Sequence, residues 1–136
     1  MIRHFTTAVA IMSIATATLT AGTLIVSNSP EEIYEPGVLV STQLNSSRTR
    51  LLYYHINRAS RDYVIQTLLQ NLTAVPVTVQ IIKAAGGPSR DGIYSGHRSA
   101  KAYWESITSG EWTALTLAPF QRFTLMAHPF RSQMVS

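Results

Sequence analysis

The clearest fold signal in this chain is the stretch VPVTVQI at residues 75–81. Large apolar side chains recur there at every second position, namely at Val75, Val77, Val79 and Ile81. Alternation with period two is typical of a strand that buries one face. A strand is also expected at 63–70, and only the short connection 71–74 separates the two. We therefore predict an antiparallel hairpin, because so short a loop joins only antiparallel neighbours.

Outward from this hairpin, the same kind of pattern predicts five more short strands. They are Thr18–Asn28, Val38–Leu44, Arg50–Asn57, Trp112–Leu117 and Phe120–Ala127, with Pro119 dividing the last two. In the strand 50–57 we expect Leu52, Tyr54 and Ile56 to face the core.

One segment changes period. Apolar residues fall at i, i+3, i+4 and i+7, at Ala100, Tyr103, Trp104 and Ile107. This spacing predicts one short helix with its apolar stripe on the core. Ser95 is the expected N-cap and Gly110 the expected end.

Strands joined by short connections, with a single helix, favour an all-β fold. We predict an immunoglobulin-like antiparallel β-sandwich, with a small barrel as the alternative. The chain has 136 residues, which suits one domain. Hydrophobic residues make up 46% of it and charged residues only 13%. A core can therefore form, and a disordered charged tail or a charged coiled coil is excluded.

The chain has no cysteine, so it carries no disulfide, no Cys-ligated metal and no thiol nucleophile. A short basic start (Arg3, His4) precedes an apolar run and the small residues Ala15-Thr16-Ala17. This order predicts a secretory signal peptide at 1–17, followed by one domain at 18–136 with a Pro/Gly linker at 29–37. An uncleaved membrane anchor is the alternative, although many Thr and Ser residues weaken it as a spanning helix. After cleavage we expect no stable membrane span.

The Gly-rich stretch 86–98 is the most unusual loop. Consecutive glycines can present backbone N–H groups to an anion, and Arg90, His97 and Arg98 add positive charge beside Asp91. With Trp112 as a stacking platform, these residues form a candidate binding site for an anion or a carbohydrate. The competing interpretation is an ordered turn, because the stretch lacks the Gly-Lys-Ser/Thr ending of a Walker loop.

Enzymatic and metal chemistry find little support. Residue types found in catalytic triads and metal sites occur at His55, His97, His128 and Asp91. However, there is no Gly-x-Ser-x-Gly elbow and no histidine pair with ligand spacing. We predict no catalytic residues, no metal and no cofactor. A minor alternative is a periplasmic copper carrier, because Met126, His128 and Met134 offer thioether and imidazole ligands for Cu(I).

Basic residues also flank aromatic ones, with Arg48, Arg50, Arg58 and Arg61 around Tyr53 and Tyr54. Aromatic side chains of this kind can stack on the bases of single-stranded nucleic acid, while the arginines contact its phosphates. An exported protein rarely meets nucleic acid, and Tyr54 is expected in the core. We therefore predict no nucleic-acid partner.

Four stretches taken together resemble a group of uncharacterised secreted bacterial β-sandwich proteins. They are GTLIVSNSPE at 22–31, PGVL at 36–39, RLLYYHIN at 50–57 and GGPSRD at 86–91. The resemblance implies a strand at 23–28 of the mature protein and brings no enzymatic residues with it.

These observations predict a non-enzymatic, extracytoplasmic structural or interaction module of the bacterial cell envelope or surface. Its partners would be other protein subunits or copies of itself. One route is strand addition, in which the strand Thr18–Asn28 pairs with the open sheet edge of a neighbour. Repeated head to tail, this contact would build a filament.

Overall fold

A computed structural model describes residues 9–12, 22–45 and 48–136. Within them the protein is mostly strands with one helix, which confirms the predicted fold at a coarse level. The strands in chain order are β1 Val9–Met12, β2 Thr23–Ser27, β3 Glu32–Ile33, β4 Ser41–Leu44, β5 Thr49–Tyr53, β6 Ile56–Asn57, β7 Tyr63–Asn71, β8 Val77–Ile81, β9 Thr113–Leu117 and β10 Arg122–Phe130. The helix α1, Gly92–Ser109, lies between β8 and β9.

The strands form one larger sheet and three pairs. The larger sheet has the order β10-β7-β1-β4, and the pairs are β2–β5, β3–β6 and β8–β9. Antiparallel pairing holds for β7 with β10 and for β8 with β9. The prediction of antiparallel pairing is wrong elsewhere, because β1 runs parallel to both β4 and β7, and β2–β5 and β3–β6 are parallel pairs.

The predicted hairpin over 63–81 does not form, although both of its strands do. β7 pairs with β10, whereas β8 pairs with β9. Asn71, at the end of β7, explains the separation. Its amide nitrogen donates to the carbonyls of Val75 and Ala118, and its oxygen accepts from the Thr73 amide. This side chain ties together the two turns that carry the chain from one sheet to the next.

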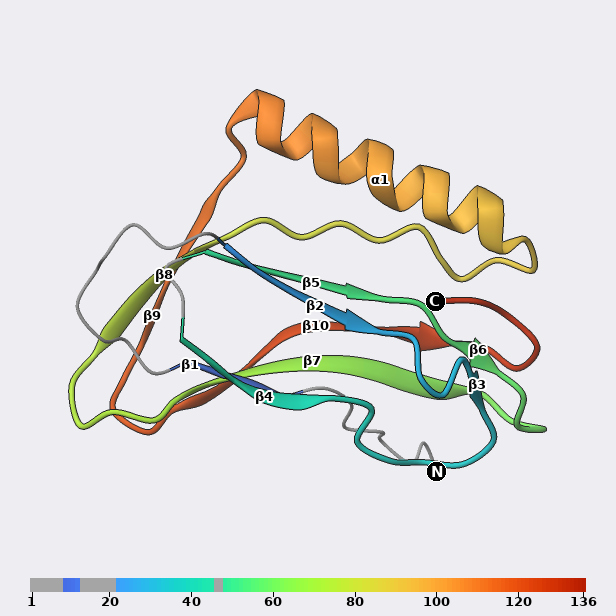
Figure 1. Ribbon diagram of the computed structural model, residues 1–136, viewed down its shortest axis with the longest axis horizontal. Helices are drawn as coiled ribbons and strands as arrows, with labels where there is room; N and C mark the ends of the chain where they lie inside the picture. Colours follow the sequence, from blue (N-terminus) through green and yellow to red (C-terminus); the bar gives the residue numbers. More distant parts are fainter. Residues whose placement is uncertain (1–8, 13–21, 46–47) are drawn as a thin grey trace.

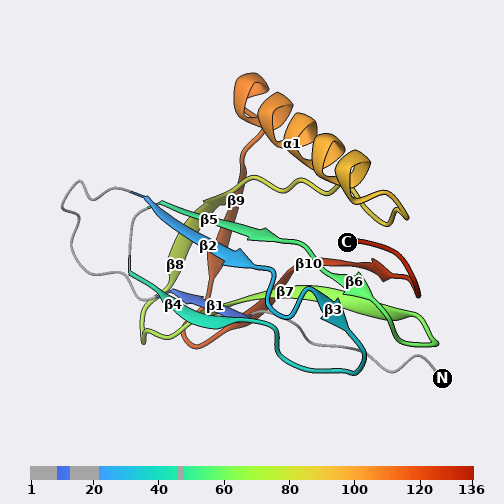
Figure 2. The same cartoon turned by 45° about the vertical axis from the view of Figure 1, so that its right-hand side comes forward.

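The β2–β5 pair and the four-stranded sheet lie in different layers, and α1 lies on the outer side of β5 (Figures 1 and 2). Two buried clusters fill the interior. One joins β3, β7 and β10 and comprises Ile33, Ala59, Tyr63, Ile65 and Phe130, with Leu39 and Tyr53 against it. The other comprises Leu44, Leu69 and Leu117, with Ile25, Val79, Leu115 and Leu125 against it.

The buried face of β5 is the opposite of the predicted one. Leu52 is exposed, while Tyr53 and the following His55 point inward. Arg50 explains this choice, because its guanidinium lies 4.0 Å from the centre of the Tyr103 ring on α1. The outer face of β5 therefore meets the helix and not the core.

The helix is longer than predicted and turned differently. Its N-cap is Asp91, not Ser95, and Asp91 accepts a hydrogen bond from the Tyr94 amide. The predicted end at Gly110 is confirmed, with a left-handed φ of 72°. Trp104 was expected in the core but is 67% exposed. Tyr103 and Ile107 of the predicted stripe are partly buried, and the buried residue of the helix is Ser95.

The predicted cleavage point after Ala17 lies outside the described residues, so the signal peptide stays a prediction. The predicted linker 29–37 contains β3, whose Ile33 is buried and pairs with β6. No helix among the described residues is long and apolar enough to cross a membrane.

Candidate functional site

The most buried polar group that carries chemistry is the pair Ser27 and His55. Ser27 ends β2 and His55 lies between β5 and β6, and both are almost completely buried. The Ser27 hydroxyl is 3.0 Å from Nε2 of His55, and Nδ1 of the same ring is 2.9 Å from the Pro30 carbonyl oxygen. A carbonyl can only accept, so Nδ1 carries the proton and Nε2 accepts from Ser27.

Burial lowers the pKa of His55, and the hydrogen bond to the Pro30 carbonyl opposes part of that shift. The ring is therefore neutral at pH 7. Its backbone is fixed as well, since His55 exchanges two hydrogen bonds with Ser136 at the C-terminus. The imidazole thus joins three segments: the end of β2, the loop at Pro30 and the last residues of the chain.

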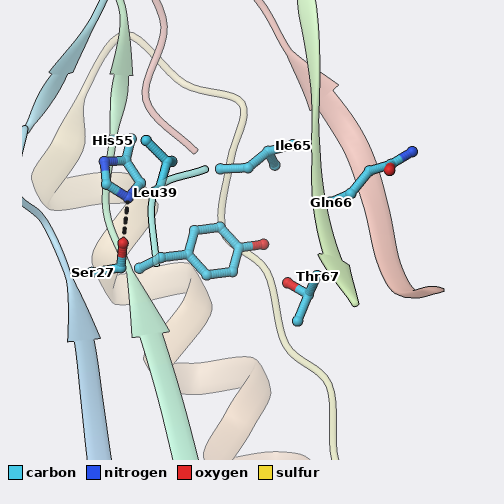
Figure 3. Close-up of a pocket in the computed structure, with 7 residues that line it drawn as sticks. Ser27, Leu39, His55, Ile65, Gln66 and Thr67 are labelled. Carbon is cyan, nitrogen blue, oxygen red and sulfur yellow. Dashed lines mark hydrogen bonds between the residues drawn. The ribbon is translucent and has the colours of Figure 1, made fainter. Parts of the chain in front are cut away.

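A serine bound to a histidine that is oriented by a third group resembles a nucleophile and its base. The cavity beside it decides what the pair can do. Leu39, Ile65 and Thr67 are among the residues that line this space (Figure 3). Its volume is about 10 Å³, the size of one water molecule. This space admits nothing larger than a water molecule, and the hydrogen bonds of His55 connect the end of β2 to the loop at Pro30.

His128 takes part in the same region. Its ring stacks on Tyr53 with centroids 5.8 Å apart, and the Tyr53 hydroxyl lies 3.3 Å from Nε2. Burial lowers the pKa of His128 and raises that of Tyr53 to about 12. The ring is thus engaged in packing. Met126 and Met134, the other ligands considered for copper, are partly buried. The described residues contain no group of three His, Cys, Asp or Glu side chains able to hold a metal.

The two consecutive glycines that begin the stretch 86–98, Gly86 and Gly87, are explained by close packing. A Cβ on Gly86 would collide with the carbonyl oxygen of Ser95, and one on Gly87 would lie 2.6 Å from the carbonyl oxygen of Val135. Gly86 lets its own segment of the chain pack closely against α1. Gly87 leaves room for Val135 and Ser136 at the C-terminal end. Both positions need the absence of a side chain for backbone contact.

The predicted site residues are only partly brought together. Asp91 caps the helix, and Arg90, His97 and Arg98 are exposed near the same end. Trp112 follows the other end, and a helix of 18 residues is about 27 Å long. Trp112 therefore does not belong to the group at the helix start.

A shallow groove runs beside α1, with two cations in it. Arg98 stacks over Tyr94 at 5.6 Å, and Lys101, one turn further on, pairs with Glu105 at 3.6 Å. Tyr94 and Lys101 were not among the predicted residues. Their spacing with Arg98, at 94, 98 and 101, identifies them once the helix is known to begin at Gly92. The Ser27–His55 pair carries no such signal, because the two residues are 28 positions apart.

Comparisons with protein families, with curated proteins and with solved structures give no match. The resemblance to secreted bacterial β-sandwich proteins therefore stays a prediction.

Proposed function

We propose that this protein is a non-enzymatic, extracytoplasmic interaction module of the bacterial cell envelope or surface, with an immunoglobulin-like sandwich as its finer architecture. It acts through contacts with copies of itself by strand addition. The observation that carries the proposal is how β2 pairs with its neighbours. Among the described residues, β5 is the only strand paired with β2, so no described strand pairs with its other edge.

The composition of β2 suits such a contact. It has no charged residue and no proline, the usual features that protect an edge strand. Leu24 is 58% exposed and Val26 54% exposed, and the register places Val26 opposite the exposed Leu52. These three residues make a small apolar face beside that edge. A second copy whose β2 aligns with this edge extends the sheet and covers the same face.

The test places a charge on the edge. Wild-type protein is expected to associate with rising concentration in sedimentation equilibrium. Val26→Lys is expected to weaken that association at least tenfold, because an edge lysine opposes pairing. Val75→Lys is the matched control, since Val75 is 61% exposed but lies outside the strands. Equal association of the two variants, or a wild type that stays monomeric, would contradict the proposal.

A second candidate function is the binding of an anion or an anionic carbohydrate in the groove beside α1. Arg98 and Lys101 support it, because both reach the same groove from successive turns. Binding of inorganic phosphate or a sulfated oligosaccharide, measured by calorimetry, is expected to fall in the double variant Arg98→Ala/Lys101→Ala. Arg131→Ala, a change in an exposed residue away from the groove, serves as the control.

A further inference from the structure

The inner position of β1 points to a second surface for strand addition. β1 lies between β7 and β4 in the larger sheet and pairs parallel with both (Figure 1). Ala10 stands opposite Leu69 on one side and Thr42 on the other. Among the described residues, β1 is the only strand that pairs with β4. The sheet is thus continuous only when an extended segment fills this position.

The position is one strand wide. Neighbouring strands lie about 4.8 Å apart, so β4 and β7 face each other across roughly 10 Å. The walls are uncharged: Ser41–Leu44 on one side and residues 68–71 on the other. Leu44 and Leu69 from the two walls are buried in one cluster with Leu117. An empty slot would leave two rows of backbone groups without partners, which is costly beside a buried core.

The segment that fills the slot belongs to the predicted signal peptide. Cleavage after Ala17 would remove β1 and leave five residues, 18–22, ahead of β2. If four of them entered the slot, one residue would remain to reach Thr23, where the intact chain has ten. One intervening residue spans at most about 7 Å, whereas stacked sheets lie about 10 Å apart. The shortened chain therefore cannot refill its own slot.

We infer that removal of the N-terminal segment turns the slot between β4 and β7 into an acceptor for a strand from a second copy. The donor is the stretch Thr18–Ala21 ahead of that copy's β2, whose side chains carry no charge. Because donor and slot then belong to different molecules, the separation of about 10 Å between the two layers of one molecule does not limit this contact. Donor and acceptor are different surfaces, and the contact therefore propagates head to tail. This contact does not use the edge of β2 on which the proposed function rests.

Sedimentation of two chains tests the inference. The full chain, Met1–Ser136, fills its own slot and is expected to lack this contact. The chain Thr18–Ser136 is expected to form multimers in which Val26→Lys leaves the slot contact intact. Excess peptide of residues 6–14 is expected to dissociate those multimers into one-to-one complexes. The same peptide with Ala10→Pro and Met12→Pro is the control, because proline removes the backbone donors needed for pairing.

Three outcomes would overturn the inference. The first is a folded monomer of Thr18–Ser136 whose amides at 41–44 and 68–71 resist hydrogen exchange as well as those of the full chain. The second is binding of the peptide to a chain that never assembles alone, which would exclude the second copy as donor. The third applies if the shortened chain is unfolded: failure of the peptide to restore its strand signal in circular dichroism would reject the slot itself.

Discussion

The two ends of β7 use the same device with different neighbours. Asn57, just before the turn into β7, and Asn71, at its far end, are both almost completely buried. Each amide nitrogen donates to two or more backbone carbonyls, and each side-chain oxygen accepts from the amide two residues on. Near Asn57, however, lie the buried His55 and the half-buried His128, whereas the partners of Asn71 are uncharged. The two ends of β7 therefore share the same asparagine hydrogen-bond pattern. Only the end at Asn57 is expected to lose stability in acid.

The largest effect is expected from removing either asparagine. Asn57→Ala and Asn71→Ala should each lower the free energy of unfolding by about 3 kcal/mol, because several buried backbone groups lose their partners at once. Urea denaturation measures the change. Asn28→Ala, at an exposed position, is the control and should stay within about 0.5 kcal/mol of wild type. If one asparagine matters no more than the control, the two ends are not equivalent.

A smaller loss is expected at the histidine end from Ser27→Ala. The change leaves Nε2 of His55 buried without its donor, at a cost of about 1–2 kcal/mol. Ser60→Ala, at an exposed turn position, is the control in the same denaturation series. A Ser27→Ala protein as stable as the control would show that the serine does not support the ring.

Lowering the pH should destabilise the Asn57 end of β7 before the Asn71 end. Because burial lowers the pKa of His55 and His128 in the folded state, the unfolded chain binds more protons, and stability falls as the pH drops below about 6.5. The loss continues until the pH reaches the folded pKa values. Hydrogen exchange should speed up first at residues 55–57 and later at 71–73. His55→Gln should flatten the dependence of stability on pH, whereas His97→Gln, at an exposed position, should not. Simultaneous opening of both ends would argue against this difference.

The smallest effect is expected from the ion pair at the surface of the histidine end. Glu32 accepts hydrogen bonds from Tyr34 and Arg58, which lower the pKa of its carboxyl, but the pair is exposed to solvent. Solvent screens such a pair, so Glu32→Gln should leave the denaturation midpoint unchanged within error. A shift as large as that of Ser27→Ala would show that this pair belongs to the buried junction.

The sequence located most of the strands because alternation is a local property, but it placed β1 in the signal peptide and β3 in the linker. It did not identify which strands pair. β7 and β8 belong to different sheets, and the turn between them is held by Asn71, which bonds to Ala118, 47 positions away. The predicted apolar stripe of the helix is correct at Tyr103 and Ile107, which are partly buried, and wrong at Trp104, which points to solvent. The buried residue of the helix is the small Ser95. Small residues give no apolar stripe, yet they allow the close approach at Gly86.

The candidate site residues were likewise predicted only where they are close together in the sequence. Arg90, Asp91, His97 and Arg98 were found together because they are close in sequence. Ser27 and His55 were missed as a pair because only the parallel register of β2 and β5 brings them within hydrogen-bond distance. Long-range pairing of this kind depends on the whole topology, which local patterns do not contain.

The placement of β1 is tested most directly by cross-linking, because the chain has no cysteine of its own. In the register, Ile11 stands opposite Gln70. The full chain with Ile11→Cys and Gln70→Cys should form a disulfide within one molecule under mild oxidation, whereas Ile11→Cys with Gln66→Cys, four residues out of register, should not. Mass spectrometry of the digested protein identifies the linked peptides. Equal yields from the two pairs, or no disulfide from the first, would contradict the claim that the N-terminal segment completes this sheet.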